Sequence, residues 1–215
     1  FFGWDWAPPV FPFGMRNQPD LHPSRGSMIR GAYIAETDGR MVVRVFVESD
    51  SDTTLDLHVT FGDARTVSQS CLARRGLNIL TCEIPDSPVP AWIAGAQNTL
   101  APLDAALYRD GIELDTRGFR TSFRKVSLSS HGRFLLSSNG VVLRWGANYV
   151  EPFFTEAETS VSRRDMLEAL SLAGGNLVRV WGGGRYADEE FLSYCDELGI
   201  AVWQDMPFAC GCCPV

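Results

Sequence analysis

The last third of the chain alternates strands and helices, and this order constrains the fold more than any other feature. Short apolar runs at residues 144–149, 176–181 and 200–203 are predicted strands. Amphipathic stretches between them are predicted helices, the first capped by Ser162 and the second by Asp188. Strands joined through helices at this spacing form parallel βαβ units with right-handed crossovers. We therefore expect ligands at the carboxyl ends of these strands.

Polar and aromatic residues stand at those carboxyl ends, in a set to which a sugar could bind. In chain order, the three strand ends hold Asn148 and Glu151, Arg179 and Trp181, and Gln204 and Asp205. Three glycines after Trp181 allow another backbone or a ligand to approach closely. They do not form a phosphate loop, because no Lys-Ser/Thr pair follows them. The sequence does not decide whether Trp203 faces this site or a helix.

Residues 25–125 alternate apolar and polar side chains, as half-buried strands do. The predicted strands of this region cover residues 28–36, 41–47, 55–61, 77–84 and 117–128. Short strands separated by polar turns are typical of an antiparallel β-sandwich. Residues 134–143 then predict a hairpin, because Asn139 and Gly140 suit a tight primed turn.

Residues 1–20 are crowded with aromatics, proline and glycine, which predicts a loop with short extended pieces. Asp5 suits a sugar ligand, because a carboxylate can accept two hydrogen bonds in a fork. Trp4 and Trp6 offer flat apolar faces that match the C–H face of a pyranose. Packing in a core is the alternative for these tryptophans, and a loop carboxylate satisfied by backbone amides is the alternative for Asp5.

The charge of the chain excludes some partners. A formal net charge of -7 over 215 residues argues against nucleic acid or an anionic membrane surface as the main partner. No stretch is long and apolar enough to predict a membrane span. The chain begins with Phe1 rather than Met, which predicts that the natural protein starts earlier. The sequence assigns no compartment.

The cysteines predict neither a disulfide scaffold nor a metal site. They are too sparse for a disulfide-rich fold of this length. The cluster near the end of the chain lacks a second pair or a nearby His to complete a metal site. The six positions are Cys71, Cys82, Cys195, Cys210, Cys212 and Cys213. The cysteine pattern therefore predicts no metal site.

Several motifs resemble glycoside hydrolase family 2, β-mannosidase branch. They are Phe-Gly-Trp-Asp-Trp-Ala-Pro at 2–8, Gly-Ala-Asn-Tyr at 146–149, Arg-Val-Trp-Gly-Gly-Gly at 179–184 and Cys-Asp-Glu-Leu-Gly-Ile-Ala-Val-Trp-Gln-Asp at 195–205. The resemblance implies a multi-domain fold. Residues 1–24 would end a jelly-roll sugar-binding domain, 25–128 would form an immunoglobulin-like antiparallel β-sandwich, and 129–215 would begin a (β/α)8 TIM barrel. Ala7 departs from the glycine expected in the first motif.

The resemblance also implies an activity, the retaining hydrolysis of terminal β-D-mannose from oligosaccharides or glycoconjugates. The substrate-binding residues would be Trp4, Asp5, Trp6 and Trp181, supported by Arg179, Asn148 and Asp205. Arg179 would reach a carboxylate near the nucleophile, with a structural ion pair as the alternative. No cofactor is needed, because the reaction uses only carboxyl groups and water.

The resemblance places the acid/base and nucleophile glutamates after Val215, so no catalytic residue is assigned in this chain. Asp5, Glu151 and Asp205 are the carboxylates in suitable positions. They come from separate segments, and nothing in the sequence predicts that two of them form the required pair. Two alternatives therefore stay open. One is a truncated, non-catalytic carbohydrate-binding or interaction fragment, and the other is a different family 2 exo-β-glycosidase.

Overall fold

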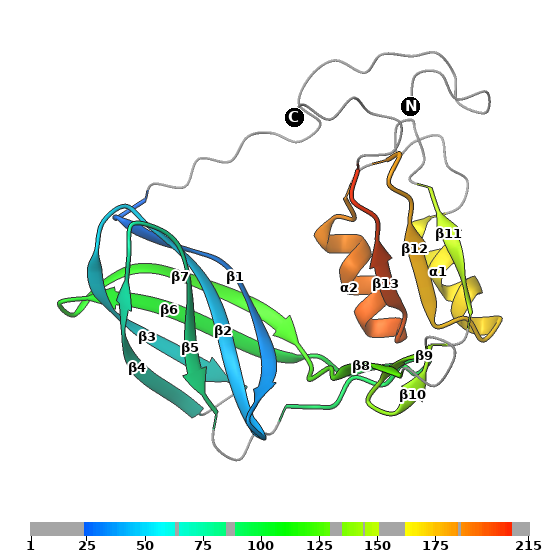
Figure 1. The fold of residues 1–215 in the computed structure, drawn as a ribbon, viewed down its shortest axis with the longest axis horizontal. Coiled ribbons are helices and arrows are strands. Elements are labelled where there is room, and N and C mark those ends of the chain that lie inside the picture. Colours follow the sequence, from blue (N-terminus) through cyan, green and yellow to red (C-terminus); the bar gives the residue numbers. More distant parts are fainter. Residues whose placement is uncertain are drawn as a thin grey trace, which may run out of the picture. The chain divides into compact units, whose positions relative to one another are not determined.

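The computed structural model describes residues 24–62, 65–84, 89–129, 135–143, 145–150, 162–184 and 186–207. Within these ranges the chain is mostly β-sheet with two helices. It divides into two compact units. Of the described residues, the sandwich unit holds 24–92 and Thr99–Lys125, and the βαβ unit holds Ile93–Asn98 and those from Val126 onward (Figure 1).

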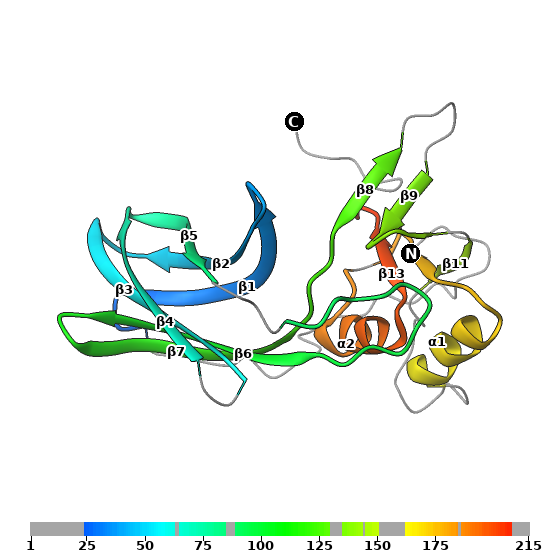
Figure 2. The same ribbon diagram turned by 90° about the horizontal axis from the view of Figure 1, so that it is seen from below.

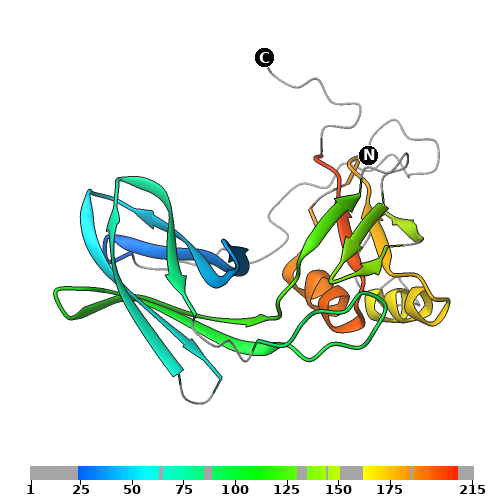
Figure 3. The same ribbon diagram turned by 60° about the horizontal axis from the view of Figure 1, so that its bottom comes forward.

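The sandwich unit consists of two antiparallel sheets that share one hydrophobic core (Figures 2 and 3). One sheet has the strand order β1-β2-β5, and the other has the order β4-β3-β6-β7. The strands are β1 (Ser27–Thr37), β2 (Arg40–Ser49), β3 (Thr53–Phe61), β4 (Arg65–Ala73), β5 (Gly76–Glu83), β6 (Ala101–Arg109) and β7 (Ile112–Thr121).

Alternating side chains build this core, as the sequence predicts. Val43 and Val45 of β2 are fully buried, and so are Leu55 and Leu57 of β3. Side chains at every second position of a strand point to the same face, so each of these strands has one face available to the core. β2 pairs with β1 and β5, whereas β3 pairs with β4 and β6. The turn between β2 and β3 therefore joins the two sheets.

The strand predicted over residues 117–128 is wrong as a single element. β7 ends at Thr121, and a separate strand, β8 (Val126–Ser129), follows in the other unit. The chain leaves the sheet because Phe123 pairs elsewhere. Its N–H donates to the Pro90 carbonyl at 2.9 Å, and its carbonyl accepts from the Trp92 N–H at 2.8 Å. β4 and β6 are not among the predicted strands, and β4 is a polar edge strand with a weak apolar pattern.

The βαβ unit contains a parallel sheet of β11 (Gly146–Tyr149), β12 (Leu177–Val180) and β13 (Ala201–Gln204), in that order. Helices α1 (Arg163–Leu172) and α2 (Glu189–Leu198) connect these strands, and both cover the same face of the sheet (Figure 2). The predicted parallel order is confirmed by the registers between the three strands. The core under the helices contains Tyr149, Leu167, Val178, Val180, Phe191, Cys195, Leu198 and Ile200.

The predicted hairpin is also confirmed in this unit. β8, β9 (Leu135–Ser138) and β10 (Val141–Val142) form a small antiparallel sheet. The turn between β9 and β10 has φ 47° at Asn139 and φ 81° at Gly140. Positive φ at both central positions is the geometry of a type I′ turn, which asparagine and glycine tolerate best.

The ends of the two helices follow from their capping residues. Ser162 and Asp165 form a reciprocal capping box at the start of α1, and Asp188 accepts a hydrogen bond from the Phe191 N–H at the start of α2. Gly199 ends α2 in the left-handed conformation, with φ 69°. The segment Ile93–Asn98 lies against this helix end, where the Gly95 N–H donates to the Gly199 carbonyl at 2.7 Å.

Candidate functional site

A row of three large or polar side chains crosses the face of the parallel sheet opposite the two helices. Asn148 of β11 is in register with Arg179 of β12, and Arg179 is in register with Trp203 of β13. Their neighbours Val178 and Val202 pack into the core under the helices. Because successive side chains of a strand alternate, Arg179 and Trp203 lie on the opposite face. Trp203 therefore faces away from the helices and is 57% exposed.

Arg179 and Asp205 form a bidentate ion pair at the carboxyl ends of β12 and β13. The Arg179 Nε donates to Asp205 Oδ1 at 3.1 Å, and Nη2 donates to Oδ2 at 2.6 Å. Nη1 is 3.5 Å from the side-chain oxygen of Asn148. This pairing fixes the plane of the guanidinium. The Arg179 side chain is still 45% exposed and can offer further N–H groups to an oxygen-rich ligand.

Asp205 is held in its ionised form. The hydrogen bonds from the Arg179 guanidinium, assisted by one from the Gly182 N–H at 3.2 Å, lower the pKa of its carboxyl group below the usual range. A general acid at neutral pH needs the opposite shift, because it must still have its proton to give. The geometry thus suits Asp205 to positioning Arg179 rather than to proton donation.

The connection between β12 and α2, described at residues 181–184 and 186–188, begins with Trp181 and close glycine contacts. The Trp181 N–H donates to the Tyr149 carbonyl at 3.0 Å. A Cβ at Gly182 would lie 2.5 Å from the Met206 carbonyl oxygen. A Cβ at Gly183 would overlap the Trp181 ring. The absence of a side chain at Gly182 lets the backbone of Met206 approach closely, and its absence at Gly183 leaves room for the Trp181 indole.

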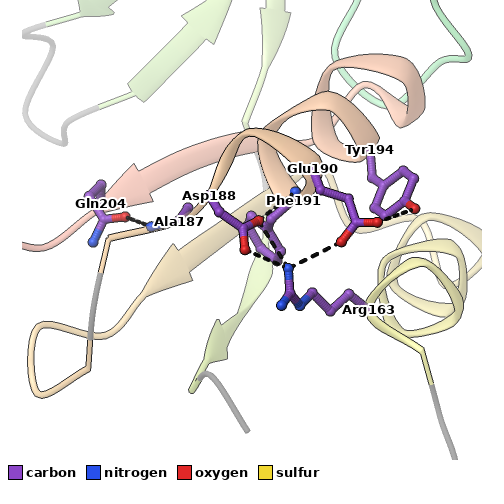
Figure 4. Close-up of polar contacts among 7 residues, drawn as sticks. All are labelled: Arg163, Ala187, Asp188, Glu190, Phe191, Tyr194 and Gln204. Atoms are coloured by element: carbon purple, nitrogen blue, oxygen red, sulfur yellow. Dashed lines mark hydrogen bonds and ion pairs between the residues drawn. The ribbon is translucent and has the colours of Figure 1, made fainter. Parts of the chain in front are cut away.

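Gln204 holds the far end of the same connection. Its Oε1 accepts a hydrogen bond from the Ala187 N–H at 3.0 Å (Figure 4). Its Nε2 donates to the Asp205 carbonyl at 2.8 Å. The Tyr186 hydroxyl lies 3.5 Å from the Met206 sulfur. Three consecutive residues at the end of β13 and just after it therefore contact the β12–α2 connection.

Ion pairs join the starts of the two helices beside this connection. The Arg163 Nη1 donates to both carboxylate oxygens of Asp188, at 2.9 and 2.7 Å, and lies 3.3 Å from Glu190 Oε2 (Figure 4). The Arg163 side chain is only 13% exposed. Asp188 also caps α2, so one carboxylate links the end of the connection, the helix start and α1.

The described residues do not meet the requirements of a three-ligand metal site or of a membrane-spanning helix. Within them, no three His, Cys, Asp or Glu side chains lie close enough together to hold a metal ion. No helix in the described ranges has the length and hydrophobicity needed to cross a membrane. The predicted residues Trp4, Asp5 and Trp6 lie outside the described part of the chain, as do Glu151 and the cysteines at 210, 212 and 213.

Known proteins resemble the chain in sequence and in fold. No family model matches it. The β-mannosidase B of Aspergillus niger is 29% identical over 231 residues, covering 98% of the chain and 27% of that protein. A β-D-mannosidase structure from Dictyoglomus thermophilum has a TM-score of 0.72 at 24% identity, over 97% of the chain and 28% of its own. A GH2 β-galacturonidase structure from Eisenbergiella tayi has a TM-score of 0.61 at 22% identity, over 83% and 33%.

The chain is similar in sequence to β-mannosidases, and it shares its fold with solved enzymes that include a β-D-mannosidase and a GH2 β-galacturonidase. It spans about a quarter of the length of the curated relative from Aspergillus niger, 27%.

The structure brings together three of the residues predicted from the sequence. Asn148, Arg179 and Asp205 meet at one edge of the sheet, with Trp181 at the end of the middle strand. The sequence analysis placed Gln204 at the same edge but gave it no role. The contact of Gln204 with Ala187 joins the end of β13 to the residue just before the N-cap of α2. The available signal in the sequence was the position of Gln204 directly before Asp205.

Proposed function

We propose that the natural protein containing this chain is a retaining glycoside hydrolase that removes terminal β-D-mannose from oligosaccharides or glycoconjugates. The observation that supports this most directly is the meeting of Asn148, Arg179 and Asp205 at the carboxyl ends of three parallel strands. Sites of α/β enzymes lie at that edge. The relatives named β-mannosidase favour mannose among the sugars such a site could accept.

The proposal includes the finer architecture. Residues 25–128 would be an immunoglobulin-like sandwich, and residues 129–215 would be the first βα units of a (β/α)8 TIM barrel. Residues 1–24 would be the end of a jelly-roll domain whose Trp-Asp-Trp loop reaches the sugar. The two-sheet core and the parallel β11-β12-β13 sheet are compatible with this assignment.

Each residue of the site then has a chemical role. Trp181, with Trp4 and Trp6, would contact the apolar face of the mannose ring, and Asp5 would accept hydrogen bonds from its hydroxyls. Arg179, oriented by Asp205, would present N–H groups to a carboxylate or to a substrate oxygen. A fixed guanidinium stabilises negative charge without reorganising during the reaction.

The chemistry itself would come from two glutamates outside residues 1–215. Retaining glycosidases place two carboxyl groups about 5–5.5 Å apart. One protonates the leaving oxygen, and the other attacks the anomeric carbon to form a glycosyl-enzyme. Water then opens that intermediate, with the first carboxylate acting as the base. The residues of this chain would bind and orient the sugar during both steps.

The test is to express the uninterrupted natural reading frame and assay it on aryl β-mannoside, β-glucoside and β-galactoside. We expect turnover of the mannoside and a collapse of that turnover in Asp5→Ala. A matched control is Asp104→Ala, which removes an exposed carboxylate from β6 of the sandwich unit. It should leave turnover unchanged. If the long protein hydrolyses none of the three glycosides, the proposed activity is wrong.

A further inference from the structure

We propose that Gln204 is a positioning residue that fixes the β12–α2 connection, and with it Trp181, in the orientation that receives the sugar. This inference rests on the proposed function for its substrate, a terminal β-mannoside. It goes beyond that function by assigning a role to Gln204, whose side chain contacts the backbone of the β12–α2 connection. The position of Trp181 would then depend on the end of the next strand, β13.

The contacts of Gln204 support a structural clamp. Both ends of its amide are engaged. Oε1 accepts from the Ala187 N–H (Figure 4), and Nε2 donates to the Asp205 carbonyl. An amide satisfied in this way has a fixed plane and few donors left for a ligand. We infer that Gln204 acts through the backbone of the connection, because its side chain already bridges β13 and Ala187.

A second contact fixes the other end of the connection. The Gly182 N–H donates to Asp205 Oδ2 at 3.2 Å, and the Asp205 N–H donates to the Val180 carbonyl at 3.1 Å. The β12–α2 connection is thus held at Gly182 by Asp205 and at Ala187 by Gln204. Because these two holders are consecutive in β13 and just after it, a shift of that strand end would move both attachment points together.

The Trp181 ring is oriented by the backbone that this clamp holds. The indole lies directly against Gly183, where any Cβ would overlap ring atoms. The Gly184 N–H donates to the Trp181 carbonyl at 3.2 Å, closing a tight turn around the same residue. A change in the path of the connection at Gly183 would therefore turn the ring. An aromatic face that stacks on a pyranose must keep its plane, so such a turn would weaken sugar binding.

Three variants of the full natural protein separate positioning from loss of folding. Gln204→Met keeps the size of the side chain and removes both hydrogen bonds. Gln204→Glu keeps the acceptor for the Ala187 N–H. Gly183→Ala breaks no hydrogen bond of the clamp but displaces the Trp181 ring. The readouts are KM and kcat on an aryl β-mannoside and hydrogen exchange at the Ala187 amide.

We expect Gln204→Met to raise KM roughly tenfold with kcat nearly unchanged, as loss of uniform substrate binding does. The Ala187 amide should exchange faster in this variant, and Gln204→Glu should recover most of both effects. Gly183→Ala should raise KM without faster exchange at Ala187. An unchanged KM in Gln204→Met, or equal losses in Gln204→Met and Gln204→Glu, would overturn the inference.

The exchange measurement keeps the two proposals distinguishable. If the full protein hydrolyses no glycoside, the proposed function fails, while exchange at Ala187 in Gln204→Met still tests the clamp. If the mannoside is hydrolysed, and Gln204→Met changes neither KM nor exchange at the Ala187 amide, the proposed function stands and the positioning role is wrong.

Discussion

Replacing Gly199 with alanine should open the contact between the end of α2 and the segment Ile93–Asn98. Gly199 has φ +69°, where an L-residue is strained, and its Cβ would meet the Ala96 carbonyl oxygen. It would also lie 2.7 Å from both the Ala96 nitrogen and the Ile93 carbonyl oxygen. All three obstacles are backbone atoms, so the segment itself must move.

The size of the effect follows from these contacts. The left-handed conformation costs alanine about 1–2 kcal/mol. Moving the segment also breaks two hydrogen bonds, from the Gly95 N–H to the Gly199 carbonyl at 2.7 Å and from the Asn98 N–H to the Glu197 carbonyl at 2.8 Å. Each contributes about 0.5–1.5 kcal/mol. Gly199→Ala should therefore destabilise this region by about 2–5 kcal/mol.

Gly174→Ala is the matched control. Gly174 follows α1 with φ +83° and has nothing within 4 Å of an added Cβ, so it incurs only the conformational cost of about 1–2 kcal/mol. Exchange at the Gly95 and Asn98 amides reports local opening directly. Relative to the control, Gly199→Ala should speed it about 5- to 150-fold, since 1.4 kcal/mol is a factor of ten. Equal protection of these two amides in both variants would refute the reasoning.

Three further predictions concern the βαβ unit. Because the Arg179 guanidinium is the main cause of the lowered pKa of Asp205, Arg179→Met should raise that pKa toward the ordinary Asp value; carboxyl-carbon NMR of both proteins checks it. The stability that Asp205 adds should be present above the unfolded-state pKa and disappear as the pH falls through the lower folded-state value. Ser162→Ala should destabilise α1 by about 0.5–2 kcal/mol through loss of its N-cap, measured by exchange within the helix, where no change would contradict the capping box. Phe191→Ala removes a ring that is 1% exposed and should cost about 3–5 kcal/mol, while Leu192→Ala, on the exposed side of α2, should cost far less in the same denaturant titration; similar losses would contradict the assigned core face.

Local signals were strong where a residue acts on its own neighbourhood. Ser162 and Asp188 cap helices through hydrogen bonds to backbone within three residues, so their roles are visible in sequence. Asn139 and Gly140 form their turn for the same reason. The roles of Trp4 and Asp5 stay predictions, because these residues lie outside the described ranges. The predicted domain limits also stay predictions.

Nonlocal pairing explains what the sequence analysis missed. The strand predicted over 117–128 ends at Thr121 because Phe123 finds its partners near Pro90, more than thirty positions earlier in the chain. The apolar residues of β4 alternate too weakly with polar ones for the sequence pattern to predict a strand. β4 pairs with β3 through backbone hydrogen bonds, which almost any residue can form. The residue types of β4 therefore do not reveal this pairing.

The sequence by itself determined the order of strands and helices in the last third of the chain, the alternating faces of the sandwich strands, and the strand-end set that includes Asn148, Arg179 and Asp205. Periodicity and capping are local properties, and parallel strands necessarily place their carboxyl ends at one edge. Only the tertiary structure decided that Arg179 pairs with Asp205, that Trp203 faces away from the helices, and that Gln204 binds Ala187. Those choices depend on strand register, and a shift of one residue would exchange the two faces of the strand.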